Sequence, residues 1–225
     1  MKRLLLVICM LSMGSLGWAQ SAPPLGSAQT FAVLGASGVS NTGPTIITGD
    51  LGVSPGTAVT GFPPGSLTGG TIHVGDAPAT AAQAAAHTAY AGLAAEPCGT
   101  NLTGKTLGTS PGAVTLSPGV YCFSASAQLT GTLTLNGSGV YIFQIKSTLT
   151  TASKSSVVLT KGATAGNVFW QVGSSATLGT NTAFEGSILA NISDTVTTGA
   201  SVTGRVFALT GAVTLSGNRI HAGSK

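Results

Sequence analysis

The side chains that could do acid–base or metal chemistry are few in this 225-residue chain and lie far apart in the sequence. Only 6% of the residues are charged, roughly a quarter of the usual fraction. Polysaccharide hydrolases and lyases need clustered carboxylates or a calcium-binding set. The only plausible pair is Glu185 with Asp194, and a solvated surface pair is the commoner explanation. The acids are Asp50, Asp76, Glu96, Glu185 and Asp194.

The three histidines, His73, His87 and His221, are also isolated. His87 has no partner four residues on, so it does not form a helical zinc pair. The sequence has no nucleophile-elbow motif, and its glycine runs lack the lysine of a phosphate-binding loop. A Ser/His/Asp site needs no adjacent members, so it stays open, but we expect a protein that is not an enzyme and uses no metal or cofactor.

The N-terminus has the layout of a secretory signal peptide. Lys2 and Arg3 precede an apolar stretch from Leu4 to about Met13, and small residues at Gly17 and Ala19 follow. The apolar run is too short to span a bilayer. We expect cleavage after Ala19, which separates a signal peptide (1–19) from a single domain (20–225). The mature protein would be secreted, outside the cell or in the periplasm, without membrane attachment.

Two cysteines, Cys98 and Cys122, remain after cleavage. An exported protein with two cysteines usually joins them, and closing this loop stabilises by about 3 kcal/mol in the chain-entropy model. The mature chain has seven basic and five acidic residues and therefore a net charge of +2. There is no basic stripe for nucleic acid, and 43% hydrophobic residues exclude a charged disordered chain. We expect a packed, β-rich monomer.

Short apolar runs recur from Leu116 onward with a spacing near 20 residues, which is the signature of a solenoid. Five first strands begin the units: Tyr121-Cys122-Phe123, Tyr141-Ile142-Phe143, Val168-Phe169-Trp170, Ile188-Leu189-Ala190 and Val206-Phe207-Ala208. Second strands follow: Gln128-Leu129-Thr130, Thr148-Leu149-Thr150, Thr177-Leu178-Gly179, Thr195-Val196-Thr197 and Ala212-Val213-Thr214. Third strands, such as Val157-Val158-Leu159 and Arg219-Ile220-His221, are more mixed. Three strands per unit predict a triangular parallel β-helix.

The second strands present an unusual outer surface. Side chains alternate along a strand, so the central Leu or Val points inward and the flanking residues point outward. These outward residues are mostly threonine, and none is charged. Threonine is a good strand residue, but strand propensity alone does not explain the absence of charge. The spacings, about 4.8 Å between coils and about 6.7 Å along a strand, are close to repeat distances in the ice lattice.

One segment breaks the β pattern. Residues 77–95 are rich in alanine and follow Asp76, a good N-cap, and Pro97 stops the segment. The sequence predicts one helix of about five turns that lies along a face of the solenoid. A Cys98–Cys122 bond would then tie the helix to the strand stack.

With these features the chain resembles the secreted microbial ice-binding (antifreeze) proteins that combine a discontinuous β-solenoid with one helix packed alongside. The resemblance covers roughly residues 28–222. It is carried by FAVLGASGVSNTG (31–43), TIITGDLGVSPG (45–56), the alanine-rich helix, LSPGVYCF (116–123), YIFQIKSTLTTASKSSVVL (141–159), NVFWQVGSSATLGTNTAFEGSILA (167–190), GRVFA (204–208) and GAVTLSGNRI (211–220).

The resemblance implies a mainly β fold, a right-handed discontinuous parallel β-helix in which the first strands, near Ser37 to Ser40, fold back beside the C-terminal coils. Active members carry T-A/G-x-T/N motifs on the flat face. Partial matches lie at Ser37-Gly38-Val39-Ser40, Asp194-Thr195-Val196-Thr197 and Gly211-Ala212-Val213-Thr214.

The leading hypothesis is a protein whose partner is the surface of an ice crystal. The expected ice-binding residues are Ser37, Ser40, Thr130, Thr148, Thr150, Thr177, Thr195, Thr197 and Thr214. The alternative is a secreted structural or adhesive β-solenoid that binds polysaccharide or a cell surface. A β-helical polysaccharide enzyme ranks third, because the acids are scattered.

Overall fold

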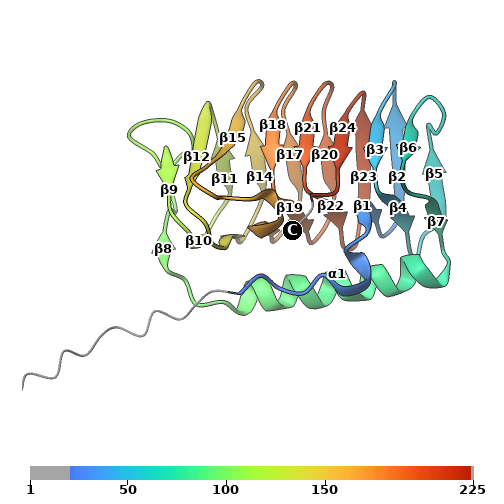
Figure 1. Ribbon diagram of the computed structural model, residues 1–225, viewed down its shortest axis with the longest axis horizontal. Coiled ribbons are helices and arrows are strands. Elements are labelled where there is room, and N and C mark those ends of the chain that lie inside the picture. Colours follow the sequence, from blue (N-terminus) through green and yellow to red (C-terminus); the bar gives the residue numbers. More distant parts are fainter. Residues whose placement is uncertain (1–20, 224–225) are drawn as a thin grey trace, which may run out of the picture.

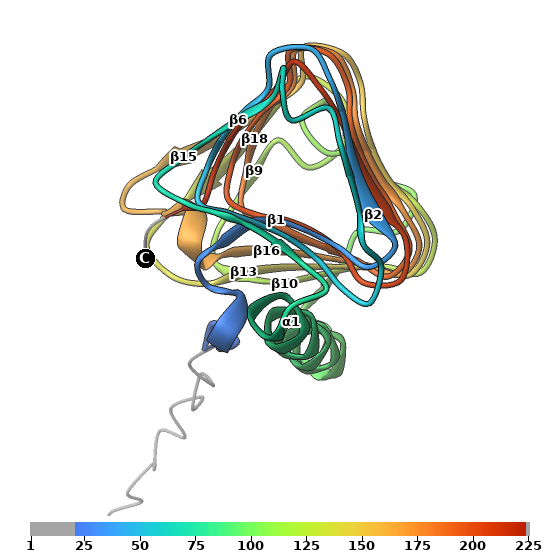
Figure 2. The same ribbon diagram turned by 90° about the vertical axis from the view of Figure 1, so that its right-hand side faces the viewer.

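The computed structural model describes residues 21–223, so the predicted signal peptide lies outside the described residues. The chain winds into a triangular prism whose three sides are parallel β-sheets, with one long helix beside the base (Figures 1 and 2). The discontinuous parallel β-helix expected from the sequence is confirmed. We call the three sides sheets A, B and C, and one full turn of the chain around the prism a coil.

Sheet A is the side beside the helix. Its nine strands are, in spatial order, β7 (Ile72–Val74), β4 (Asp50–Val53), β1 (Phe31–Gly35), β22 (Val206–Ala208), β19 (Ser187–Ala190), β16 (Val168–Val172), β13 (Tyr141–Ile145), β10 (Gly119–Phe123) and β8 (Thr100–Asn101). Two 3₁₀ turns, η1 (Gly26–Ala28) and η2 (Ala165–Asn167), lie just before strands of this sheet.

Sheets B and C form the other two sides. Sheet B has seven strands, in the order β11 (Ala127–Leu129), β14 (Leu149–Thr151), β17 (Ala176–Leu178), β20 (Asp194–Val196), β23 (Ala212–Ser216), β2 (Gly38–Thr42) and β5 (Ala58–Thr60). Sheet C has eight, in the order β6 (Ser66–Thr68), β3 (Ile46–Thr48), β24 (Arg219–His221), β21 (Ser201–Thr203), β18 (Ala183–Glu185), β15 (Ser156–Thr160), β12 (Thr132–Asn136) and β9 (Thr115–Leu116).

The solenoid is discontinuous because its N-terminal coils follow its C-terminal coil in space. In each sheet a strand from the N-terminal segment pairs with the last C-terminal strand: β1 with β22, β2 with β23, and β3 with β24. The stack therefore continues from residue 221 directly into residues 31–75. Figure 1 shows this as blue strands beside dark red ones.

The helix α1 (Ala77–Ala95) has the predicted bounds, and the Asp76 carboxylate accepts a hydrogen bond from Ala79 N at 2.9 Å. Its alanine face packs on sheet A in a second apolar cluster that includes Phe31, Phe169 and Phe207. Small side chains let the helix axis approach the sheet. At the far end Gln144 Nε2 donates to the carbonyls of Leu93 and Glu96, both at 2.7 Å. Among residues 21–223, no helix is both long and apolar enough to cross a bilayer.

The disulfide is confirmed: Cys98, just after α1, is bonded to Cys122 in β10, at a sequence separation of 24.

Replacing both cysteines with serine is expected to lower the free energy of unfolding by about 3 kcal/mol, because the unfolded chain regains the freedom of that loop. Urea denaturation of the double variant measures the loss. A wild type whose urea midpoint does not change on reduction would contradict this expectation. All seven strands of sheet B lie outside the bridged loop (98–122), and we expect the surface of sheet B to survive reduction at low temperature.

The order of the predicted strands is correct, but their pairing differs in several places. Leu149 pairs with Ala127, not with Leu129, and Val213 pairs with Asp194, not with Val196. In sheet A, Tyr121 pairs with Phe143 instead of Tyr141. A shift by two residues keeps the same side chains inward, so the pattern of alternation cannot detect it.

One shift by a single residue does change a face. The sequence pattern placed Val158 inward, but Val157 pairs with Leu133 and is buried, whereas Val158 points outward and is 40% exposed. Because Val157 and Val158 are both apolar, the sequence pattern is equally compatible with either of them pointing inward. The hydrogen-bonded hydroxyls of Thr132 and Ser156, 2.9 Å apart on the outer surface, accompany the observed register.

Candidate functional site

The outer surface of sheet B carries a continuous column of uncharged polar side chains, which we call the central column. The register places one residue from each strand in it. The column reads Gln128, Thr150, Thr177, Thr195, Thr214, Ser40 and Thr60. Neighbouring members are separated by one strand spacing, about 4.8 Å. All seven are exposed or half-exposed.

The hydroxyl groups in the middle of the central column differ from those beside it; toward one end of the column, Ser40 Oγ donates to Thr214 Oγ1 at 3.5 Å. Among residues 21–223, the structure gives the hydroxyls of Thr150, Thr177 and Thr195 no protein partner within hydrogen-bonding distance. By contrast, Thr148 Oγ1 donates to Ser126 Oγ at 2.8 Å and Thr197 Oγ1 donates to the Leu178 carbonyl at 2.7 Å. The hydroxyls of Thr150, Thr177 and Thr195 therefore keep their whole hydrogen-bonding capacity for water.

The predicted site residues divide between the central column and its margins. Thr150, Thr177, Thr195, Thr214 and Ser40 form most of the column. The others, Thr130, Thr148, Thr197 and Ser37, flank it; Thr130 Oγ1 accepts a hydrogen bond from Gln128 Nε2, and Ser37 lies just before β2. All nine predicted residues therefore lie on or at the edge of sheet B, as expected.

Three members of this surface, Gln128, Thr57 and Thr60, are not among the predicted site residues. Gly38 pairs with Ala58 and Ser40 with Thr60, so Thr57-Ala58-Val59-Thr60 is in register with the partial motif that begins at Ser37. It is a full T-A-x-T match in the terminal coil. The signal was present in the sequence, but strands before the helix were not aligned with the later units.

A shallow hollow of about 210 Å³ lies beside the column near this end. It exists because Gly38, Ala58 and Ala212 carry little or no side chain there, while Ser40 and Thr60 form its rim. Small residues next to a row of hydroxyls leave room for water molecules against the sheet.

Asp194 corrects another expectation. From the sequence, the commoner explanation was a solvated surface pair of Asp194 with Glu185. The structure buries it: Asp194 is 1% exposed, and its neighbours in the sheet are Ala176 and Val213. Burial raises the pKa of Asp194 well above its ordinary value. The outer surface of sheet B therefore has no charge at this point.

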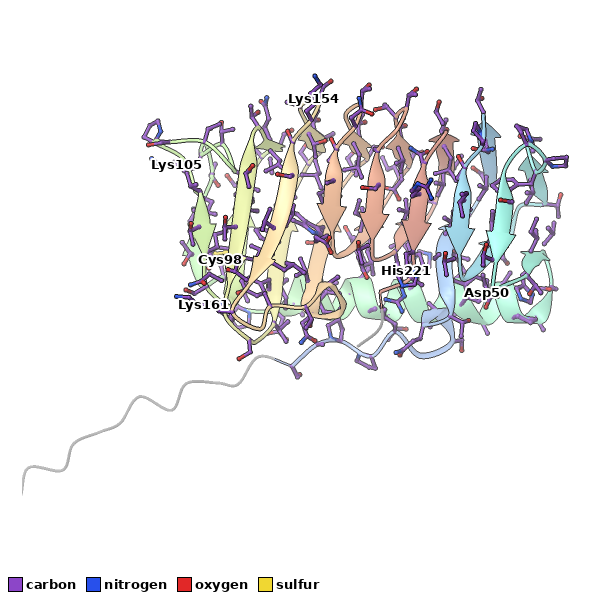
Figure 3. The ribbon with its side chains drawn as sticks, turned by 45° about the horizontal axis from the view of Figure 1, so that its top comes forward. Asp50, Cys98, Lys105, Lys154, Lys161 and His221 are labelled. Carbon is purple, nitrogen blue, oxygen red and sulfur yellow. A yellow bond between two sulfur atoms is a disulfide. The ribbon has the colours of Figure 1, made fainter. Side chains whose placement is uncertain are left out.

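The other two sheets differ from sheet B. Sheet A is covered by α1. The outer surface of sheet C carries Arg219, His221 and Glu185 and is mixed, as predicted. Burial raises the pKa of Glu185, and a hydrogen bond from Thr203 offsets part of this effect. Figure 3 shows Lys154 at the apex where sheets B and C meet and His221 farther down sheet C.

Among residues 21–223, no three His, Cys, Asp or Glu side chains are close enough to share a metal ion. His73 lies between Thr71 and Asp76, just before α1. Its Nε2 is 2.8 Å from Thr71 Oγ1, and its Nδ1 is 2.8 Å from Oδ2 of Asp76, which also caps the helix. The hydrogen bonds to Asp76 lower the pKa of its carboxyl group.

Gln128 is the one long side chain of the central column, so its replacement tests the column directly. On the hypothesis that this surface binds ice, Gln128→Thr is expected to strengthen adsorption to ice, because threonine is stiff at χ1 whereas a glutamine loses rotamer freedom of about 1 kcal/mol on a surface. A gain of about 1 kcal/mol in adsorption free energy corresponds to roughly a fivefold longer residence of the protein on the ice surface. Thermal hysteresis at equal concentration measures the gain. Gln128→Glu, of matched size, is the control and should weaken adsorption; an increase with Glu would contradict the reasoning.

Comparison with known proteins gives a consistent result. The family model described as "Ice-binding-like" matches residues 33–221. An ice-binding protein of Nostoc sp. (strain HG1) is 53% identical over 207 residues, covering 90% of this chain and 75% of the relative. An ice-binding protein of Colwellia sp. is 35% identical and covers 96% of this chain and 92% of the relative.

Solved structures agree. The crystal structure of the ice-binding protein from the Antarctic ascomycete Antarctomyces psychrotrophicus has a TM-score of 0.84 and 40% identity, covering 91% of this chain and all of that one (100%). An ice binding protein from an Antarctic biological consortium has a TM-score of 0.86 and 42% identity, covering 97% of each chain. The chain therefore belongs to the ice-binding-like family.

Proposed function

We propose that this protein adsorbs to ice crystals through the outer surface of sheet B, with the central column as the main contact. The observation that carries the proposal is a column of seven uncharged positions, mostly threonine, whose register is fixed by backbone pairing and whose middle hydroxyls have no partner within residues 21–223. A charged side chain would hold water in a geometry that ice cannot match.

The chemistry of threonine suits this role. Its methyl group orders neighbouring water, its hydroxyl joins the hydrogen-bonded layer, and its restricted χ1 keeps the array in place at little entropic cost. Below the surface, inward residues such as Leu149, Leu178 and Val196 are buried in the core and hold the strands rigidly. The hollow beside Ala58 offers room for a row of water molecules that belongs to the ice layer.

Adsorption at many points has a physical consequence for the crystal. The ice front curves outward between adsorbed molecules, and a curved front melts at a lower temperature than a flat one. The crystal then neither grows nor melts between its freezing and melting temperatures, and this gap is the thermal hysteresis. For the same reason, large crystals cannot grow at the expense of small ones. The protein thereby inhibits recrystallisation.

The remaining parts of the proposal follow from the same features. Relatives and structural neighbours are named ice-binding proteins, and adsorption needs no catalysis or cofactor. We propose a non-enzymatic monomer that is exported by the signal peptide (1–19) and acts outside the cytoplasm, with ice as its partner.

The direct test uses the purified mature chain (20–225). Growth of single ice crystals in a nanolitre osmometer should show faceting and a measurable thermal hysteresis, and sucrose solutions should show inhibited recrystallisation. Fluorescently labelled protein should be taken up into a growing ice hemisphere, whereas a labelled protein of similar size should be excluded. No uptake and no hysteresis at high concentration would overturn the proposal and favour the adhesive alternative.

A further inference from the structure

The carboxyl group of Asp194 is buried directly beneath the central column. Asp194 begins β20, between Ser193 and Thr195, whose side chains are half-exposed on the outer surface. Its own side chain points into the prism. Both carboxyl oxygens are buried, and neither has a hydrogen-bond partner among residues 21–223.

The surroundings of Asp194 offer nothing to a negative charge. Its neighbours in the sheet, Ala176 in β17 and Val213 in β23, are apolar. The residues that point inward from the adjoining strands of sheets A and C belong to the apolar core: Ile188, Ala190, Val206, Ala208, Phe184 and Val202. An isolated carboxylate in such a place costs several kcal/mol, so the group stays protonated instead.

The other charged side chain buried within residues 21–223 does not act on it. The Arg205 guanidinium donates to the Gln29 carbonyl at 2.6 and 3.2 Å and to the Gly223 carbonyl at 3.3 Å. Desolvation alone raises the pKa of Asp194, with no contribution from a neighbouring charge. The folded structure thus accommodates the neutral acid and not the anion.

We propose that Asp194 is a positioning residue that makes ice adsorption depend on pH: β20 keeps its place in sheet B only while the Asp194 carboxyl is neutral. The inference rests on the proposed function of sheet B. When the group ionises, it must reach water, and β20 is only three residues long. Turning Asp194 outward displaces Thr195 and interrupts the central column between Thr177 and Thr214.

The direction of the effect follows from proton linkage. In an opened coil the pKa of Asp194 returns toward its ordinary value of 3.8, whereas in the closed coil the pKa is raised. Between these two values the closed form binds more protons, so it is most favoured at acidic pH and loses stability as pH rises. The population of the opened form should rise about tenfold for each pH unit in that window.

Amide hydrogen exchange tests the first half of the inference. After correction for the intrinsic pH dependence, exchange at Thr195 and Val196 should accelerate about tenfold per pH unit in the wild type. In Asp194→Asn, which has the same shape and no charge, it should not change with pH. Asp50→Asn is the matched control, because Asp50 lies in sheet A and accepts from Thr71 N; it should behave as the wild type. Asp194→Ala, which copies its neighbour Ala176, replaces the Asn variant if that variant does not fold.

Recrystallisation inhibition at pH 5 and pH 9 tests the second half. The wild type should need several-fold more protein at the higher pH, and Asp194→Asn should need the same amount at both. Equal exchange and equal inhibition at the two pH values in the wild type would overturn the inference. Faster exchange without weaker inhibition would overturn the link to ice. If neither the wild type nor Asp194→Asn acts on ice at any pH, the proposed function fails, while the exchange data still decide whether β20 opens.

Discussion

A Thr150→Tyr/Thr195→Tyr variant is expected to lose thermal hysteresis and ice shaping, yet to unfold at nearly the same temperature as the wild type. Both side chains point outward from the middle of sheet B, and neither hydroxyl has a protein partner within residues 21–223. Surface substitutions away from such partners change the free energy of unfolding by roughly 0.5 kcal/mol at most. Tyrosine is also a good strand residue.

The loss of activity has a steric cause. A phenol ring stands above the plane that threonine methyl and hydroxyl groups form, so it keeps neighbouring coils from the crystal as well as its own. A loss of only about 1.4 kcal/mol of adsorption free energy lowers occupancy tenfold. With two rings separated by β17, the flat contact along the central column is interrupted at two of its seven positions.

The matched control places the same change on another side of the prism. Thr134 and Thr48 are half-exposed and point outward from sheet C, so Thr134→Tyr/Thr48→Tyr adds two rings of equal size. This variant should keep full thermal hysteresis. Nanolitre osmometry measures activity, and circular dichroism confirms the fold. An inactive sheet C variant beside an active sheet B variant would move the ice-binding surface to sheet C.

The sequence is sufficient to predict which residues lie on the outer surface of sheet B, because alternation decides which residues point outward. Every outward position in Thr148-Leu149-Thr150 and its counterparts keeps its face when the pairing shifts by two residues. The same property hides the true pairing. Leu149 can align with Leu129 or with Ala127 without exposing an apolar group, and the lengths of the corners, which carry no periodic pattern, decide between them.

Asp194 shows the opposite kind of error. Because Thr195 points outward, alternation alone places Asp194 inward, beside Val196 in orientation. The general rule that carboxylates face water led to the wrong assignment. Local pattern and residue type disagreed at this position, and the pattern was correct. A residue whose type conflicts with the alternation pattern around it often has a role beyond packing.

The core beneath the sheets gives the largest expected effect on stability. Four aromatic side chains contact one another in a row: Tyr121, Phe143 and Trp170 from three neighbouring coils, and Phe184 from sheet C in the same coil as Trp170. The rings of Phe143 and Trp170 are stacked, with centroids 3.8 Å apart and planes within 7°. Trp170 is fully buried, and its Nε1 donates to the Glu185 carbonyl at 3.0 Å. It therefore links sheets A and C as well as neighbouring coils.

Trp170→Ala is expected to lower the free energy of unfolding by about 3–5 kcal/mol, because it leaves a large cavity and an unpaired carbonyl. A domain of this kind has a total free energy of unfolding of roughly 5–15 kcal/mol, so about a fifth or more is lost. Trp170→Phe keeps most of the stack and removes the hydrogen bond, and should cost about 1–2 kcal/mol. Urea denaturation of both variants separates packing from hydrogen bonding.

The two variants together test whether stability and ice adsorption reside in different parts of the molecule. Trp170 lies inside sheet A, and the central column lies outside sheet B. At temperatures where Trp170→Ala is still folded, its thermal hysteresis per folded molecule should equal that of the wild type. Cooling weakens hydrophobic stabilisation, so the folded fraction near 0 °C must be measured in the same sample. A folded Trp170→Ala protein without activity would mean that the core sets the spacing of the threonines, and that the surface alone does not specify adsorption.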